Sequence, residues 1–318
     1  MRYRTDLPQL HGDLFVTDGG LETTLIFHHG IELPEFAAFD LLKHPQGTET
    51  LRSYYRRYLG LAREHGAGFI LESPTWRASP GWARRIGYSE GDLEAMNRKA
   101  IGLMEEIRVE ADESSAAIGP MVISGCIGPE GDGYSPERIL SPDAAQAYHE
   151  IQIATFADTA ADMVTAITMT YADEAIGVAL AAKHASIPAV ISFTLETDGR
   201  LPSGQALAET IDAVEAATDG YPAYYMINCA HPTHFEDVLD GGAWLEKIRG
   251  LRANASTRSH EELDEAEDLD DGDPEDLGAR YAALREKLPS LNVVGGCCGT
   301  DHRHVSEICW ALVTTSRT

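Results

Sequence analysis

The chain has 318 residues, 43% of them hydrophobic, which is enough to bury a large core in one barrel or in two ordinary domains. With 25 Lys and Arg against 51 Asp and Glu, its formal net charge is -26 at pH 7, which argues against binding nucleic acid or an anionic membrane surface. No apolar run approaches the roughly 18 to 20 residues of a spanning helix, and the first residues lack the apolar core of a signal peptide, so a cytoplasmic protein is expected.

Eight short apolar runs, several of them ending in small or polar residues, are predicted to form strands. Runs of this length that are apolar throughout are typical of strands buried on both faces of a parallel sheet. In chain order they cover residues 13–20, 68–73, 121–129, 162–168, 188–194, 223–229, 248–256 and 292–298.

Longer segments with helical periodicity lie between these strands, at 49–67, 89–111, 141–161, 172–185, 206–220 and 276–288. Strands that alternate with amphipathic helices indicate a parallel sheet covered by helices. Repeated eight times in about 300 residues, this pattern predicts a (β/α)₈ TIM barrel, with residues 1–318 as a single domain. The rival is an open doubly wound sheet, but no G-x-G-x-x-G motif follows a predicted strand.

An acidic loop insertion is predicted at about residues 257–276. Residues 260–278, "HEELDEAEDLDDGDPEDLG", contain many acids and no Lys or Arg, and indicate a solvated excursion or a short exposed helix. The loop either covers the site or is merely exposed. Because the residue spacing of an EF-hand is absent, the acidic run does not predict a calcium site.

In a barrel of this class the active site lies where the strands end, at the C-terminal face. Polar or thiol side chains do finish the predicted strands, and we expect them to gather on one rim. They are Asp18, Glu72, Ser124, Thr168, Thr194, Asn228, Cys229, Asn254, Cys297 and Cys298.

Three of the five cysteines predict a metal site. Cys229 ends the sixth strand, and Cys297 and Cys298 end the eighth, so a closed barrel brings them together. Three thiolates with one open position are typical of catalytic zinc, whereas structural zinc has four protein ligands. The neighbouring glycines, Gly295, Gly296 and Gly299, are expected to let two consecutive side chains face one ion. The other two cysteines, Cys126 and Cys309, are expected to be buried and inert.

The sequence also resembles the homocysteine S-methyltransferase family. "INC" at 227–229 and "GGCCGT" at 295–300 are similar to its split cysteine signature, and "TDGGLETTL", "SPTWRAS", "SGCIGPEGD" and "ISFTLETDGRLPSGQAL" resemble further segments of the family. The resemblance covers about residues 13 to 305. It implies a Zn²⁺-binding barrel that moves a methyl group onto a thiol, with Asp18, Gly19 and Gly20 in the first-strand motif that organises the substrate pocket.

The predicted reaction transfers a methyl group from a small-molecule donor to a small-molecule thiol acceptor, which is homocysteine in the family. Zinc favours the thiolate form of a bound thiol, and that sulfur attacks the methyl group of a sulfonium or quaternary ammonium donor. Aromatic rings can hold such a cation, and Trp76 is the candidate near the second strand end. The product with homocysteine is methionine. Asn228, which precedes a cysteine of the motif, is a further candidate for the substrate pocket.

One position departs from the family. The resemblance implies a Glu for the homocysteine amino group at the end of the fourth strand, where this chain has Ile167. An apolar side chain cannot neutralise an ammonium group. Either Glu72, Glu196 or Asp18 replaces the missing acid, or the thiol is not homocysteine.

Two alternatives therefore remain beside the homocysteine S-methyltransferase. The first is a zinc-dependent methyltransferase or demethylase of the same fold that acts on another thiol. The second is a non-enzymatic zinc-binding or redox-sensing protein, in which a histidine closes the metal site. The histidines beside the cysteine motifs are His231, His234, His302 and His304. The sequence leaves the methyl donor and the oligomeric state open, including a homo-oligomer.

Overall fold

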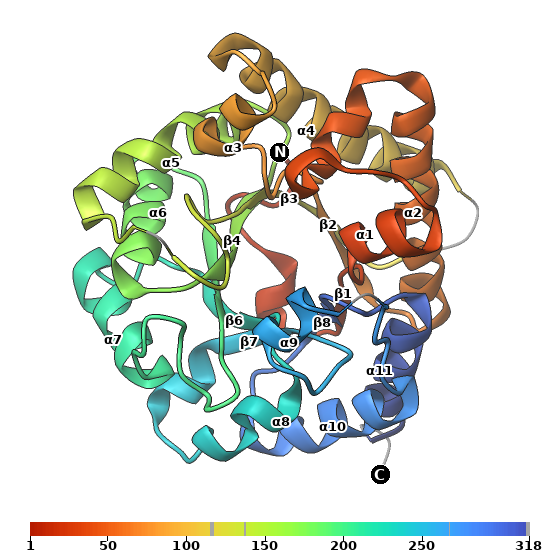
Figure 1. Ribbon diagram of the computed structural model, residues 1–318. Helices are drawn as coiled ribbons and strands as arrows, with labels where there is room; N and C mark the ends of the chain where they lie inside the picture. The colour runs from red at the N-terminus through yellow and green to blue at the C-terminus, as the bar shows by residue number, and fades with distance from the viewer. Residues whose placement is uncertain (115–117, 137, 267, 316–318) are drawn as a thin grey trace.

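Eight parallel strands form a closed barrel in sequence order, and each strand pairs with the next until β8 pairs with β1. The computed structural model describes residues 1–114, 118–136, 138–266 and 268–315. Figure 1 looks along the barrel, with the helices arranged outside the strands. The predicted (β/α)₈ barrel is confirmed. The strands are β1 (Phe15–Val16), β2 (Gly68–Glu72), β3 (Met121–Ile127), β4 (Met163–Met169), β5 (Ala189–Thr194), β6 (Tyr224–Asn228), β7 (Ile248–Ala253) and β8 (Val293–Gly296).

Six long helices match the periodic segments of the sequence: α2 (Pro45–Glu64), α4 (Glu90–Glu113), α5 (Pro142–Ala157), α6 (Ala172–His184), α7 (Leu207–Thr218) and α10 (Pro274–Lys287). Two of these helices begin where a polar side chain caps the free backbone amides of the first turn. The hydroxyl of Ser141 accepts a hydrogen bond from the Ala144 amide at α5, and the Asp273 carboxylate accepts from the Glu275 and Asp276 amides at α10. In both helices proline occupies the first position, where it needs no hydrogen-bond partner.

One long helix was not predicted. Helix α11 (His302–Thr315) follows β8 and packs against α10 and α2. Val305, Ile308, Cys309 and Leu312 are buried, and their spacing is that of an apolar helical face. The shorter helices are α1 (Leu21–Thr23), α3 (Pro80–Arg85), α8 (Pro232–Phe235) and α9 (His260–Asp264), joined by 3₁₀ turns at Pro8–His11, Pro34–Phe36, Ala38–Lys43, Glu236–Val238 and Ala243–Lys247 and by a π-turn at Thr24–His28.

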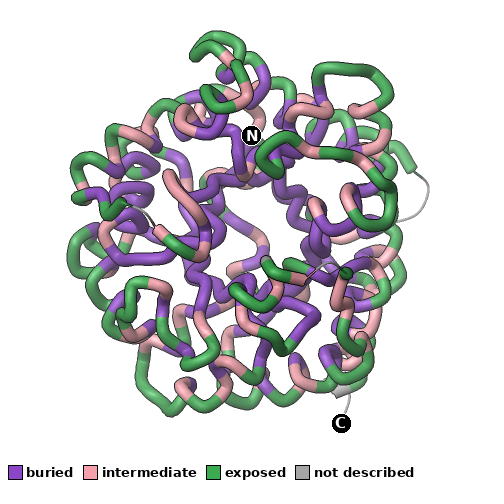
Figure 2. Tube along the Cα trace, in the orientation of Figure 1, coloured by how far each residue is buried: buried purple, intermediate pink, exposed green. Residues whose placement is uncertain are grey.

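The hydrophobic core has two parts, and both are continuous with the strands. The larger part lies between the strands and the helices, as the purple ring in Figure 2 shows. The smaller part fills the barrel with one or two side chains from seven of the eight strands, and Leu7 of the N-terminal segment packs against it. Because the interior is filled, a ligand can enter only at the rim of the barrel. The side chains of this inner part are Leu7, Phe15, Ile70, Val122, Met163, Val190, Tyr224, Met226 and Val293.

Among the helices of the described ranges, none combines the length and the apolar character that crossing a bilayer requires.

Candidate active site at the carboxyl ends of the strands

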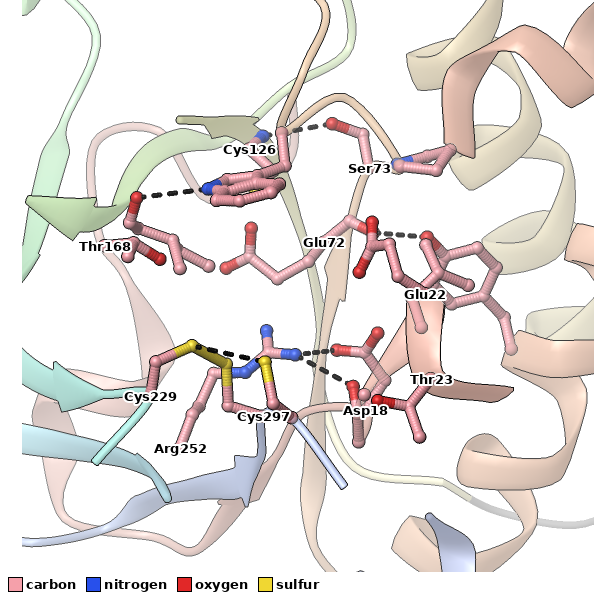
Figure 3. A pocket seen from close by; sticks show the side chains of 18 of the residues that line it. Asp18, Glu22, Thr23, Glu72, Ser73, Cys126, Thr168, Cys229, Arg252 and Cys297 are labelled. Carbon is pink, nitrogen blue, oxygen red and sulfur yellow. Dashed lines mark hydrogen bonds and ion pairs between the residues drawn. A yellow bond between two sulfur atoms is a disulfide. The ribbon is translucent and has the colours of Figure 1, made fainter. Parts of the chain in front are cut away.

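The ends of several strands surround one pocket, as the barrel rule predicted (Figure 3). Of the polar strand ends named from the sequence, six side chains line it: Asp18, Glu72, Thr168, Cys229, Cys297 and Cys298. Four others lie fully buried in the barrel wall: Ser124, Thr194, Asn228 and Asn254. Six of the ten expected side chains therefore lie around one pocket, and the other four are not among the residues that line it.

The three predicted cysteines lie together. Their sulfur atoms are all within 4.8 Å of one another, and the Sγ atoms of Cys229 and Cys298 are 4.0 Å apart. Cys229 follows β6 with a left-handed backbone, at φ 52°, which is uncommon for a residue other than glycine. Such a conformation persists where the surrounding structure enforces it, and here it directs the sulfur into the pocket.

The glycines around the cysteine pair have different roles from the one expected. Only Gly299 has a left-handed backbone, at φ 77°. A Cβ atom on Gly295 would lie 1.9 Å from the Thr17 hydroxyl, and one on Gly296 would lie 2.1 Å from the Thr300 hydroxyl. Gly295 is required by close packing of β8 against the end of β1, and Gly296 by close packing against Thr300 in the turn after β8, while Gly299 provides the left-handed residue of that turn.

Cys229 and Cys297 are joined by a disulfide in this structure, with their Cα atoms 5.3 Å apart, and Cys298 is a separate thiol. From the sequence all three were expected to be thiolates, and this bond was not predicted. The bond shows that two strands far apart in the sequence bring their cysteines within bonding reach. Only the reduced protein can offer three thiolates to a metal, because a disulfide sulfur is not a thiolate.

The donor set fits zinc. Tetrahedral zinc with Zn–S distances of about 2.3 Å holds its sulfur ligands about 3.8 Å apart, close to the separation of Cys229 and Cys298. Among the described residues, the metal-competent group around these sulfurs consists of cysteines alone. The nearby histidines make hydrogen bonds elsewhere: His231 with Thr233, His234 with the Thr257 carbonyl, His304 with the Asp271 carbonyl.

Asp18 is held by two partners at the end of β1. Arg252 on β7 donates to Asp18 Oδ1 at 2.7 Å, and the Tyr54 hydroxyl donates to Oδ2 at 2.9 Å. Arg252 also donates to the carbonyls of Gly296 and Gly19. The buried ion pair thus ties β1 and β7 to the strand that carries the cysteine pair.

Gly19 and Gly20 line the pocket and allow the first strand to approach the cysteine turn. A Cβ atom on Gly20 would lie 2.6 Å from the Cys297 carbonyl, and one on Gly19 would lie 2.7 Å from the Tyr58 hydroxyl. The motif therefore requires glycine for a steric reason.

Two further acids line the pocket. Glu72 ends β2 with 5% of its surface exposed, and Glu22 lies in α1 and is partly exposed. Burial raises the pKa of each carboxyl to about 7. Glu196, the other acid considered for the role of the missing glutamate, lies in the loop after β5 and is not among the residues that line the pocket.

Trp76 lies at the pocket as predicted. Its indole Nε1 donates to the Ile167 carbonyl at 3.4 Å, and the Arg77 guanidinium lies 4.0 Å from its ring centroid. The protein's own cation therefore already lies over this ring. A second aromatic residue, Tyr134, also lines the pocket, and its hydroxyl is 3.4 Å from Cys298 Sγ.

Asn228 supports the wall of the pocket. Its Oδ1 accepts from the Thr168 amide at 3.0 Å and from the Ser192 hydroxyl at 2.6 Å, and its Nδ2 donates to the Thr168 hydroxyl at 2.9 Å. These bonds hold Thr168 in a left-handed backbone, at φ 67°, beside Ile167, which faces the pocket. Asn228 acts on the pocket through Thr168, and its amide is already bonded.

The acidic loop lies on the same rim. The Ala255 amide donates to the Cys298 carbonyl at 3.0 Å, and the Tyr134 ring stacks on the buried His260 ring with centroids 4.0 Å apart. Ala255 precedes the predicted insertion, but a Cβ atom on Gly299 of the cysteine turn would lie 2.8 Å from the Asp270 carbonyl, so the insertion itself packs beside this turn and, through His260, beside the loop after β3. Residue 267 of this insertion lies outside the described residues.

Several residues that line the pocket were missed or assigned no role from the sequence, and those that bear on its chemistry are Arg252, Glu22, Tyr134 and Cys126. Arg252 lies within the seventh strand, two residues before Asn254, which was chosen instead. Side chains two positions apart on a strand point to the same face, so the residue two positions before the chosen strand end, Arg252, was also a candidate for the rim. Cys126 is buried as expected, and burial raises the pKa of its thiol, but it borders the pocket.

Comparisons with known proteins agree with this geometry. The family model for homocysteine S-methyltransferase matches residues 15–312. The oxidized form of the homocysteine methyltransferase MmuM from Escherichia coli has a TM-score of 0.71 at 20% identity, covering 98% of this chain and 99% of that chain. Its metallated form has a TM-score of 0.66 at 19% identity, covering 96% of each chain. At such identities the likeness shows the fold. No match was found among curated proteins.

Proposed function

Because the chain belongs to the homocysteine S-methyltransferase family, as its motifs indicated, we propose that it is a zinc-dependent enzyme that methylates homocysteine to give methionine. The methyl donor in this proposal is a small sulfonium or quaternary ammonium compound. The observation that carries the proposal is the cluster of Cys229, Cys297 and Cys298 in the pocket at the barrel rim. The proposal requires the three cysteines to be reduced, which fits the cytoplasmic setting expected from the sequence.

In the reduced protein, the cysteines after β6 and β8 would hold the metal, because they offer three sulfur donors on one side of the pocket. Zinc bound there would lower the pKa of an incoming thiol, so that a thiolate is available at neutral pH. In the transfer, the thiol loses its proton and its sulfur forms a bond to the methyl carbon. The donor's bond to that carbon breaks, and the donor leaves as a neutral thioether or tertiary amine.

The remaining residues of the pocket suit a cationic donor. Glu22 and Glu72 contribute acids, while the charge of Asp18 is balanced by Arg252. A pocket with this sign of charge and aromatic residues attracts an onium group. Tyr134 supplies aromatic surface beside Cys298, whereas the Trp76 ring already has the Arg77 guanidinium over it.

Ile167 supports the alternative that the acceptor is another thiol. Its side chain faces the pocket and cannot bind an ammonium group. The same fold and cysteines would then methylate a different thiol, or demethylate an onium compound, with the same bond changes at sulfur.

A reconstituted assay tests the proposal. The reduced, zinc-loaded protein is mixed with homocysteine and a panel of donors that includes S-methylmethionine, S-adenosylmethionine and betaine, and methionine is measured by mass spectrometry. Methionine from at least one donor is expected. Zinc-loaded protein that forms no methionine from any donor, but methylates another thiol, would favour the alternative.

A further inference from the structure

We propose that Glu72 is the residue that recognises the ammonium group of the acceptor, so that the acceptor is an amino thiol. This inference rests on the proposed function, and it assigns to the chain a specificity residue on β2. The ligand group is a primary ammonium at the end of the pocket away from the sulfur cluster.

Two of the three described acids that line the pocket are available to a ligand. Asp18 already accepts from Arg252 and Tyr54 with its two carboxylate oxygens. Ile167, at the end of β4, offers no charge. Of the described acids that line the pocket, Glu22 and Glu72 remain.

The two acids differ in whether a buried carboxylate oxygen lacks a partner. Glu22 in α1 keeps part of its surface exposed, and its carboxylate oxygens are not among the buried atoms that lack a hydrogen-bond partner. Glu72 is 95% buried, and its Oε2 has no hydrogen-bond partner among the described residues. A buried carboxylate oxygen without a partner is costly, and a ligand that donates a charged hydrogen bond removes that cost.

The direction of the side chain fits a ligand in the pocket. In Figure 3 the Glu72 side chain leaves β2 and extends across the pocket toward Thr168, while the cysteines lie below it. The hydroxyls of Ser124 and Thr165 lie beside the carboxylate and favour its charged form. Glu72 therefore presents a carboxylate to the same space into which the sulfur atoms point.

Arg252 does not supply the missing partner. Within the part of the chain that the structure describes, its ion pair is with Asp18, and its Nε and Nη2 atoms donate to Asp18, Gly19 and Gly296. Its charge acts on Glu72 at longer range and lowers the pKa of that carboxyl, which burial nevertheless raises to about 7. An ammonium group bound beside Oε2 would supply the missing hydrogen-bond donor and stabilise the negative charge of the Glu72 carboxylate.

The acceptor's ammonium fits this position better than the donor's onium. An ammonium group carries N–H donors that can bond an orphaned oxygen, whereas a methylated sulfonium or quaternary nitrogen carries none. The aromatic ring of Tyr134 lines the pocket and offers the onium group a binding surface of the kind it prefers.

The test compares two thiols that differ only in the amino group, homocysteine and 4-mercaptobutanoate. Binding to the reduced, zinc-loaded protein is measured by calorimetry for the wild type, Glu72→Gln and the matched control Glu22→Gln. We expect Glu72→Gln to weaken homocysteine binding about 10- to 100-fold and 4-mercaptobutanoate binding less than about twofold. Glu22→Gln should leave the preference between the two thiols unchanged.

Two results would overturn the proposal. They are a preference for homocysteine over 4-mercaptobutanoate that Glu72→Gln leaves unchanged, whether or not both thiols bind more weakly, and a change in the KM of the methyl donor alone. Circular dichroism and zinc content of each variant show that it is folded and loaded. Failure of the proposed function is a separate outcome, because it would appear as a wild-type protein that methylates neither thiol.

Discussion

Arg252 Nη2 lies 2.7 Å from Asp18 Oδ1, and both residues are buried. This ion pair links the seventh strand to the first beneath the pocket, and Tyr54 donates to the second oxygen of the same carboxylate. Two strands that flank the cysteine-bearing β8 are thereby held together by charge. The arrangement fixes the floor of the pocket and removes Asp18 from the groups that are available to a ligand.

Replacing Arg252 by methionine should destabilise the fold. The change keeps most of the volume but leaves the Asp18 carboxylate buried without its cation, which costs about 3 to 5 kcal/mol for a broken buried pair. The free energy of unfolding, measured with urea, should fall by that amount.

The double variant Asp18→Asn with Arg252→Met is the control for this prediction. It removes both charges, and we expect it to recover at least half of the lost stability, because no uncompensated charge remains. If the double variant is less stable than Arg252→Met alone, the interpretation of the pair as mutually compensating is wrong.

Replacing Cys298 by serine should abolish metal binding and methyl transfer together. A hydroxyl is a poor ligand for zinc beside two thiolates, so the zinc content should fall from about one per chain to near zero. Elemental analysis and the methionine assay measure the two effects.

The matched control for the Cys298 variant is Cys309→Ala, because Cys309 is fully buried in α11 and does not line the pocket. It should retain zinc and activity, with at most a modest loss of stability. A Cys298→Ser protein with full zinc content and turnover would contradict the proposed metal site.

The disulfide between Cys229 and Cys297 predicts that metal binding depends on reduction. Protein treated with a mild oxidant should lose the ability to bind zinc, since two of the three ligands are then bonded to each other. Addition of dithiothreitol should restore it. Peptide mapping without reduction would identify the linked pair. A Cys229–Cys297 peptide from protein that still holds one zinc would disagree with the assignment of these ligands.

The preference for an amino thiol should depend on pH. Burial raises the pKa of Glu72 to about 7, so its carboxylate is charged above that pH and protonated below it. Arg252 opposes this rise, Asp18 adds to it, and Glu22 lines the same pocket. Homocysteine binding should therefore weaken relative to 4-mercaptobutanoate as pH falls through about 7, by up to about tenfold per pH unit.

The ratio of the two affinities is the quantity to measure, because the ionisation of the thiol is common to both ligands. In Glu72→Gln the ratio should be independent of pH between about 5.5 and 7.5. A wild-type ratio that is flat over this range would show that Glu72 does not contact the ammonium group.

The barrel was predictable because its strands are apolar along their whole length and recur with helices between them. All eight predicted strands overlap strands of the structure. Helix α11 was missed although Val305, Ile308, Cys309 and Leu312 have helical spacing. The reason is that its first residues, His302 and His304, were interpreted as part of the rim chemistry. The prediction that residues 1–318 form one domain stays a prediction.

The sulfur cluster was predictable from strand ends, since the closed topology fixes which strand ends share a rim. Strand patterns alone do not specify which partner a buried charge selects. Arg252 and Asp18 are 234 positions apart in the sequence, and their pairing follows from the register of β7, β8 and β1. For the same reason, the positioning role of Asn228 and the unpaired oxygen of Glu72 emerge only from the packed structure.

X-ray absorption at the zinc edge tests the central claim most directly. The reduced, zinc-loaded protein should show three sulfur ligands from Cys229, Cys297 and Cys298 and one lighter ligand, and saturating homocysteine should raise the sulfur number to about four. Replacement of the light ligand by sulfur is the predicted result. A site with a fourth protein ligand, such as a histidine nitrogen, that is unchanged by homocysteine would contradict the account and leave a closed zinc site without catalytic function.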